Sequence, residues 1–194
     1  MRSPDLFPVF LNLSRRPVLL VGGGTVAASK LAGLKRAGAD VTVVAPRISP
    51  AIADAGVVRL EYRCFRTSDL DGQWLVVSAA PGDVNRAVAR AAQRRRIFVN
   101  AVDDPASASA YLGGVLHRDG VTIAVSTSGA APALAGLLRE GLECLIPVDL
   151  TRWLTQARWL RRQQRRQGVP MADRRPQLLE ALTRLYESRV RSAS

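Results

Sequence analysis

Three consecutive glycines, Gly22 to Gly24, follow a short apolar run and constrain the fold of this chain more than any other feature. The run PVLLV (17–21) predicts a buried strand that enters a tight turn. Residues 25–39 are mostly helix formers with apolar side chains on one face, and VTVVAP (41–46) predicts a second strand. A strand, a glycine turn, a helix and a second strand in this order predict the first crossover unit of a parallel sheet.

The glycine turn also carries a ligand-binding pattern. Gly22-x-Gly24-x-x-Ala27 fits the G-x-G-x-x-G/A fingerprint of dinucleotide-binding domains. In that fingerprint, Gly22 permits the tight turn, Gly24 lets a pyrophosphate approach the backbone, and Ala27 lets helix and strand pack closely. The helix N-terminus then offers free N–H groups to the phosphates. The strand–turn–helix context favours dinucleotide binding over a purely structural glycine turn.

The second strand departs from the fingerprint. An acidic residue is expected at its end to bind the adenosine ribose, but the sequence continues into Ala45-Pro46-Arg47. Arg47 could stack on adenine or meet a 2′-phosphate, which leaves NADP open beside NAD. The alternative is a solvated loop arginine.

The rest of the chain extends the same pattern and then changes. Further strands are predicted at 57–65, 74–80, 97–102 and 121–127, and helices at 49–55, 84–94, 132–146, 150–167 and 177–191. The first part is therefore predicted to be α/β with a parallel sheet. The last two helices are amphipathic, and we expect them to pack on the main domain or on a second subunit.

Polar residues that could carry chemistry follow two predicted strands. Asn100 and Asp103 come at the end of IFVNAV, where polar groups of a parallel sheet face the ligand crevice, and an aspartate there can transfer a proton. A turn aspartate before proline is the alternative. Ser126, Thr127 and Ser128 form a hydroxyl-rich loop that could bind carboxylates or merely cap a helix.

Other residue types exclude several kinds of site. His117 is the only histidine, which rules out a multi-histidine metal site, and it is expected in a turn. Cys64 and Cys144 lie 80 residues apart without a C-x-x-C pattern, which argues against a disulfide framework or a thiolate zinc site. We expect both to be buried. The longest charge-free stretch, 121–138, is broken by a Ser-Thr-Ser-Gly loop and a proline, so we expect a soluble, cytoplasmic protein without a membrane span.

The charge distribution indicates a polyanionic partner. The chain has 28 Lys+Arg and 16 Asp+Glu, for a net charge of +12. Residues 151–194 alone carry 11 basic and 3 acidic side chains. Nucleic acid, an acidic lipid surface, or a small molecule rich in carboxylates or phosphates would suit such a surface.

Together these motifs resemble a known family. Four segments of the chain are similar, in order, to the N-terminal region of sirohaem synthase, the precorrin-2 dehydrogenase/sirohydrochlorin ferrochelatase family. They are LFPVFLNLSRRPVLLVGGGTVAASKLAGLKRAGADVTVVAP, Asp83-Val84-Asn85, RRIFVNAVDDP and TIAVSTSGAAPALAGLLRE. The resemblance covers residues 5–145 and, more loosely, the basic tail. It implies NAD-dependent oxidation of precorrin-2 to sirohydrochlorin, in a sirohaem or cobalamin route. Some members also insert Fe²⁺ to make sirohaem.

The resemblance also implies a domain plan and site residues. It implies an NAD-binding Rossmann domain at 1–112, a dimerisation segment at 113–147 and a basic helical domain at 148–194, assembled as a homodimer. Its NAD contacts correspond to Gly22, Gly24, Thr25, Val26, Pro46 and Arg47, and its catalytic aspartate corresponds to Asp103. Asn100 and the serine loop would meet the substrate, and no resident metal is implied. Because the methyltransferase domain of some relatives is not part of this sequence, precorrin-2 is expected from a separate uroporphyrinogen-III methyltransferase.

Two departures make Fe²⁺ insertion the weaker expectation. Tyr111-Leu112-Gly113-Gly114 replaces an aromatic-x-x-Pro segment, and Ala131 stands where a serine usually precedes the proline. Two other functions remain open from the sequence. One is an NAD-sensing regulator that binds DNA through the basic helices, which is disfavoured because no helix-turn-helix pattern is clear. The other is a relative that binds tetrapyrrole or metal without oxidising it.

Overall fold

The computed structural model describes residues 6–56, 58–148 and 150–192, with side chains up to residue 184. The chain divides into two compact units. The first unit contains Met1–Gly113 and Ser126–Pro132, and the second contains Gly114–Val125 and Ala133–Ser194. The serine loop therefore belongs to the same unit as the glycine turn, although a hairpin separates it from that unit in the sequence.

A five-stranded parallel sheet forms the centre of the first unit. Its strands are β1 (Pro17–Val21), β2 (Asp40–Val44), β3 (Arg59–Glu61), β4 (Leu75–Ser78) and β5 (Phe98–Ala101), in the order β3-β2-β1-β4-β5. The prediction of a Rossmann-like α/β fold is confirmed. The chain reverses direction across the sheet after β3, so that β1 lies between β2 and β4, where ligands bind in such folds.

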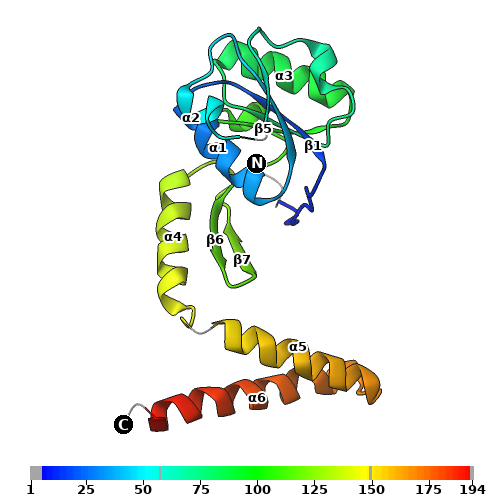
Figure 1. Cartoon of the computed structure of the whole chain (residues 1–194), viewed down its shortest axis with the longest axis vertical. Helices are drawn as coiled ribbons and strands as arrows, with labels where there is room; N and C mark the ends of the chain where they lie inside the picture. The colour runs from blue at the N-terminus through cyan, green and yellow to red at the C-terminus, as the bar shows by residue number, and fades with distance from the viewer. Residues whose placement is uncertain (1–5, 57, 149, 193–194) are drawn as a thin grey trace, which may run out of the picture. The chain divides into compact units, whose positions relative to one another are not determined.

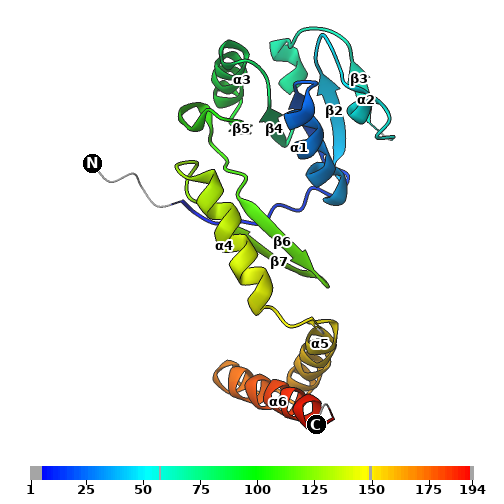
Figure 2. The ribbon, with the colours of Figure 1, turned by 90° about the vertical axis from the view of Figure 1, so that its left-hand side faces the viewer.

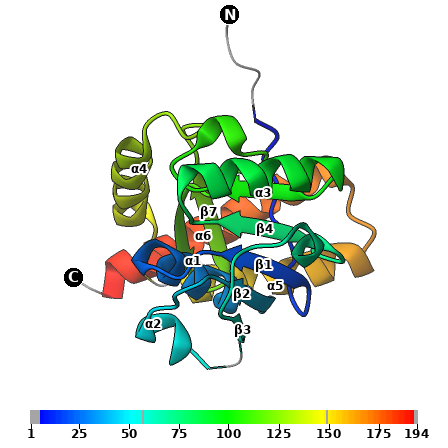
Figure 3. The same ribbon diagram turned by 90° about the horizontal axis from the view of Figure 1, so that it is seen from above.

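Helices cover both faces of this sheet (Figure 3). They are α1 (Thr25–Arg36), α2 (Pro50–Ala53) and α3 (Gly82–Arg94), with short 3₁₀ segments η1 (Thr67–Leu70) and η2 (Pro105–Ser107). On one face, Leu31 of α1 packs in a cluster with Leu20 of β1, and on the other Val88 of α3 packs with Leu19. Because β1 is covered on both faces, its sequence is a continuous apolar run rather than an alternating one.

The second unit begins with an antiparallel hairpin. Its strands are β6 (Gly114–Arg118) and β7 (Val121–Val125), and α4 (Pro132–Leu145) lies beside them in Figure 2. The Arg118 side chain fixes this packing by donating to the main-chain oxygens of Glu143 (3.3 Å) and Ile146 (2.9 Å). The turn between the strands, Asp119-Gly120, has φ values of 49° and 82°, which suit a type I′ hairpin turn.

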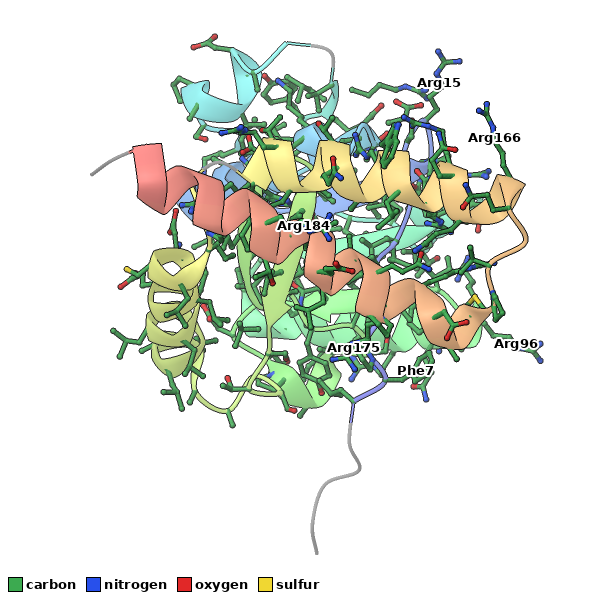
Figure 4. All side chains as sticks on the ribbon, turned by 90° about the horizontal axis from the view of Figure 1, so that it is seen from below. Phe7, Arg15, Arg96, Arg166, Arg175 and Arg184 are labelled. Carbon is green, nitrogen blue, oxygen red and sulfur yellow. The ribbon has the colours of Figure 1, made fainter. Side chains whose placement is uncertain are left out.

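The chain ends in two helices that run side by side in opposite directions (Figure 1). They are α5 (Leu150–Arg166) and α6 (Met171–Ser192). Between them, the buried Gln164 side chain donates to the Arg174 carbonyl (3.2 Å) and to Gln177 Oε1 (2.9 Å). Arg166 of α5 and Arg175 and Arg184 of α6 are exposed, and Arg166 projects away from the end of α5 in Figure 4. In the described part of the chain, no helix combines the length and apolar character that a membrane crossing requires.

Several predictions about single elements were wrong. His117 is in strand β6 and its Nδ1 lies 3.1 Å from Thr122 Oγ1 across the hairpin, so it is not a turn residue. Cys64 and Cys144 are both exposed, not buried. Helix α6 starts at Met171, six residues earlier than predicted, and contains Pro176. The second-turn proline removes one helical N–H without ending the helix.

Candidate functional site

The glycine turn connects β1 to α1 at the carboxyl edge of the sheet. Gly22 has φ +125°, and a Cβ at this position would lie 2.2 Å from the Ala79 carbonyl oxygen. Its N–H donates to the carbonyl oxygen of Val44 (3.0 Å), the last residue of β2. Only glycine can therefore occupy this position, because both the backbone conformation and the neighbouring strand exclude a side chain.

Gly23 has a role that the fingerprint does not contain. A Cβ at Gly23 would lie 2.0 Å from the Arg47 carbonyl oxygen, which leaves no room for any side chain. The Ser49 N–H donates to the Gly23 carbonyl oxygen (2.8 Å). This close approach fixes the loop after β2, including Pro46 and Arg47, beside the glycine turn. Gly23 was not among the predicted site residues, although an additional glycine between the two of the fingerprint was the signal that could have identified it.

Gly24 differs from its two neighbours. A Cβ there would meet nothing within 4 Å, so the protein itself does not require glycine at this position. Gly24 is the N-cap of α1, and neither a capping side chain nor an acidic residue occupies the first turn. The first N–H groups of α1 are therefore available to an anion, and the open space beside Gly24 lets it approach.

The residues after Gly24 divide between packing and exposure. Ala27 is fully buried and packs with β1 and β2, as the fingerprint requires. Thr25 and Val26, predicted to contact NAD, are both exposed, and Val26 keeps 45% of its surface accessible. An apolar side chain exposed at a helix N-terminus is available to a ligand that covers it. The geometry of residues 22–27 thus fits a dinucleotide.

The second predicted cofactor pair lies on the loop after β2. Pro46 and Arg47 are both exposed, and no ion pair involves Arg47 among the residues that the structure describes. The nearest acidic side chain on the neighbouring strand β3, Glu61, already accepts a hydrogen bond from Arg63 Nε (3.2 Å). The end of β2 therefore presents a cation to the adenosine side and no carboxylate.

The end of β5 places Asn100 and Asp103 differently. Asn100 is 7% exposed, and its Nδ2 donates to the carbonyl oxygen of Ala110 (2.9 Å), so its amide already has a structural partner. Asp103 is exposed and has φ +57°, a left-handed conformation that aspartate tolerates better than most residues. Its carboxylate is therefore presented to solvent by the turn that follows the strand.

The serine loop lies beside this turn, within the first unit. The Cβ position of Gly129 is 3.0 Å from the Pro105 ring and 3.5 Å from the Tyr111 ring. Within the loop, Ser126 Oγ accepts the N–H of Ser128 (3.2 Å), and Thr127 Oγ1 accepts the N–H of Ala131 (3.2 Å). Ser128 itself has φ +55°. The fold thus brings the hydroxyl-rich loop close to the residues that follow Asp103, while two of its hydroxyls also support the loop.

Two further findings define what lies outside this site. A groove of about 590 Å³ is formed by α3, the start of β5 and the segment after η2, and exposed arginines such as Arg86 and Arg90 line it. It lies at the amino end of β5, whereas Asp103 follows the carboxyl end. Among the described residues, no group of three or more His, Cys, Asp or Glu side chains could hold a metal ion.

Comparisons with known proteins agree with this geometry. A family model described as putative NAD(P)-binding matches residues 9–114, and a model described as the central part of sirohaem biosynthesis proteins matches residues 118–143. "Siroheme synthase 3" of Aeromonas hydrophila is 41% identical over 175 residues, which is 88% of this chain and 37% of that protein. "Siroheme synthase" of Escherichia coli O139:H28 is 42% identical over 88% of this chain and 38% of its own length.

A solved structure extends the likeness to the fold. "SirC, precorrin-2 dehydrogenase" superposes with a TM-score of 0.71 and 27% identity, over 90% of this chain and 88% of that one. The chain therefore spans little more than a third of the curated siroheme synthases it matches, but most of the solved dehydrogenase. With its glycine turn and parallel sheet, the chain belongs to the putative NAD(P)-binding family, and it is related to sirohaem synthases and to the solved precorrin-2 dehydrogenase.

Proposed function

We propose that this protein uses NAD to oxidise precorrin-2 to sirohydrochlorin in sirohaem or cobalamin biosynthesis. The observation that carries the proposal is the likeness to a precorrin-2 dehydrogenase over 90% of the chain. The geometry of the first unit supports it, because the glycine turn and Asp103 both follow the carboxyl ends of strands in one parallel sheet. Ligands of such sheets bind outside these ends.

The residues of the turn and the neighbouring loop would hold the cofactor. Gly22 and Gly24 shape the turn, the N–H groups at the start of α1 receive the pyrophosphate, and Thr25 and Val26 lie against it. Pro46 and Arg47 line the adenosine side. When bound, NAD supplies a nicotinamide ring that accepts a hydride.

Asp103 is the proposed general base. Dehydrogenation removes a hydride and a proton from the substrate, and the exposed carboxylate of Asp103 would take the proton. Precorrin-2 carries many carboxylates, so the N–H and hydroxyl donors of Ser126, Thr127 and Ser128 are proposed to bind its periphery. For Asn100 we propose only an indirect part, since its amide is already bonded to the Ala110 carbonyl.

The proposal includes a homodimer. Segment 113–147 is proposed to dimerise and 148–194 to form a basic helical domain, beside an NAD-binding domain at 1–112. A separate uroporphyrinogen-III methyltransferase is the proposed source of precorrin-2, and the cytoplasm the proposed location. Size-exclusion chromatography with light scattering tests the assembly, since a mass near 42 kDa, twice the 20.9 kDa of one chain, is expected.

The test is anaerobic conversion of precorrin-2 with NAD, followed by absorbance. The unmodified protein should form sirohydrochlorin, and Asp103→Asn should lower kcat by about 10²- to 10⁴-fold, the usual contribution of a general base. Asparagine is the better substitution than alanine, because it also tolerates the left-handed φ of this position. NAD affinity should stay unchanged in the variant. NAD binding without any oxidation by the unmodified protein would instead indicate a sensing or tetrapyrrole-binding role.

Fe²⁺ insertion is a second candidate activity. The similarity to proteins named siroheme synthases over 88% of the chain favours it. Insertion replaces two pyrrole N–H protons with the metal, so it also needs a base at the substrate, and Asp103 is the proposed acceptor. Adding Fe²⁺ to sirohydrochlorin with the unmodified protein and with Asp103→Asn tests it. An insertion rate equal to that without protein would exclude this activity.

A further inference from the structure

The buried side-chain amide of Asn85 connects three segments next to the turn that carries Asp103. Asn85, in the first turns of α3, is 2% exposed. Its Oδ1 accepts hydrogen bonds from the fully buried Ser78 hydroxyl (2.6 Å) and from the Ala80 N–H (3.2 Å). Its Nδ2 donates to the Val102 carbonyl oxygen (3.1 Å). One side chain thus joins the end of β4, the start of α3 and the residue that precedes Asp103.

Val102 is held at both of its backbone polar groups. Its N–H donates to the Ser78 carbonyl oxygen (2.8 Å), while its carbonyl oxygen accepts the Asn85 amide. The Asp104 N–H closes the turn by donating to the Ala101 carbonyl oxygen (3.3 Å). Asp103, with φ +57°, lies between these fixed points. The backbone that carries its carboxylate is therefore set by contacts made behind it, not by its own side chain.

Packing of α3 does not require this polar residue. Val88, Ala91 and Ala92 are each fully buried against the sheet and dock the helix by apolar contact. Burying an amide among them is tolerated only if its hydrogen bonds are made, because a buried polar group that loses its partner destabilises the fold. A residue of this kind at one point of an apolar face indicates a requirement for its particular bonds.

We propose that Asn85, together with Ser78, is a positioning residue that fixes Asp103 for catalysis. The proposal rests on the proposed dehydrogenase function. In this proposal, Asn85 contacts neither the substrate nor the cofactor. Its amide holds the Val102 carbonyl, and the turn then directs the Asp103 carboxylate. Displacement of a catalytic group by about 1 Å can lower a rate by about 10²-fold, so loss of this bond should act on kcat.

Asn85→Asp is the most specific perturbation. An ionised carboxylate retains the acceptor for Ser78 and Ala80 but cannot donate to Val102. It also adds a buried negative charge that repels the Val102 carbonyl oxygen, so the bond toward Asp103 is the contact that is lost. Ser109→Ala is the matched control. Ser109 Oγ accepts the Val99 N–H (2.9 Å) near the amino end of β5, whereas Val102 follows the carboxyl end of that strand. Ser78→Ala is a second variant, milder because it leaves the bond between Asn85 and Val102 in place.

The expected kinetic result separates positioning from folding. Asn85→Asp should lower kcat for precorrin-2 at least tenfold with less than a twofold change in the Kd of NAD, and Ser78→Ala should lower kcat less. Ser109→Ala should leave both unchanged. In the Asp103→Asn background, Asn85→Asp should have no further effect on kcat, since the group it positions is gone. Equal kcat losses in Asn85→Asp and Ser109→Ala, or additive losses with Asp103→Asn, would overturn the proposal.

A readout without turnover keeps the two proposals distinguishable. Amide hydrogen exchange of Val102 and Asp104 can be measured by NMR in the unmodified protein and in the Asn85→Asp and Ser78→Ala variants. Exchange should be at least tenfold faster in Asn85→Asp than in the unmodified protein. If Asn85→Asp fails to fold, the same exchange is measured in Ser78→Ala, in which a smaller acceleration is expected. Exchange that is unchanged in the folded variants refutes the positioning role, whereas an inactive unmodified protein with the expected exchange refutes only the dehydrogenase function.

Discussion

The three glycines of the turn should respond differently to the same small substitution. Gly23→Ala places a methyl group 2.0 Å from the Arg47 carbonyl oxygen, whereas Gly24→Ala places one where nothing lies within 4 Å. Gly24 has φ −88° and ψ −169°, which alanine adopts without strain. The first change should therefore damage mainly the fold, and the second should damage mainly the binding of the dinucleotide.

The magnitude follows from the contact. Non-bonded heavy atoms prefer a separation of about 3.5–4.0 Å, so the loop after β2 must retreat by more than about 1 Å from an alanine at position 23. That movement breaks the 2.8 Å hydrogen bond from the Ser49 N–H to the Gly23 carbonyl. Overpacking of about 1–3 kcal/mol and loss of a hydrogen bond worth about 1 kcal/mol give a destabilisation of about 2–4 kcal/mol. For Gly24→Ala, the weaker N-cap costs less than about 1 kcal/mol.

Thermal unfolding and NAD titration separate the two effects. Gly23→Ala should lower the Tm by about 5–15 °C, at roughly 2–4 °C for each kcal/mol in a chain of this size. Gly24→Ala should lower the Tm by only a few degrees but raise the Kd of NAD at least tenfold, because its methyl group fills the approach to the pyrophosphate. An unchanged Tm for Gly23→Ala, or an unchanged Kd for Gly24→Ala, would refute this account of the turn.

Three more predictions concern charge and buried polar contacts. Burial alone would raise the Asp69 pKa, but the Arg63 hydrogen bonds (2.8 and 2.9 Å) outweigh it and leave the pKa below its ordinary 3.8. Asp69→Asn should therefore destabilise the protein at pH 7. The difference in Tm between the variant and the unmodified protein should become smaller as the pH falls through and below 3.8. Arg47→Ala should weaken NADP binding several-fold, about 0.5–1 kcal/mol, and change NAD binding by less than twofold in parallel titrations. Gln164→Ala should destabilise the α5–α6 pair by about 1–3 kcal/mol in a melt followed by circular dichroism, with exposed Gln167→Ala as control.

The sheet could be predicted from the sequence because its signals are local and strong. Strand β1 matches the predicted run at 17–21, since a parallel strand covered on both faces is apolar throughout. Strand β3 is much shorter than the predicted 57–65. It lies at the sheet edge and pairs only with β2, through residues 59–61. Strand β6 was missed, although the Asp119-Gly120 pair that precedes β7 is a hairpin signal.

The contacts that organise the site could not be predicted in the same way. The close approach of Gly23 to Arg47 and the bond between Asn85 and Val102 join residues separated by 24 and 17 positions. Sequence patterns report periodicity and local conformation, whereas such contacts depend on how helices and loops pack on the completed sheet. The fingerprint therefore identified Gly24, which leaves space for a ligand, but not the residues that support the turn.

The buried polar side chains of the first unit are concentrated near its proposed site. Four polar side chains are buried among the residues that the structure describes, and three of them, Ser78, Asn85 and Asn100, lie in or beside the last residues of β4 and β5. The left-handed Asp103 and the side-chain-excluding Gly22 follow the carboxyl ends of β5 and β1. Burying polar groups costs stability unless their hydrogen bonds are made, so the grouping of these three side chains at the strand ends supports a site there. Substitutions that act on the amino end of β5, such as Ser109→Ala, which removes the hydroxyl that accepts the Val99 N–H, should accordingly change stability and leave turnover intact.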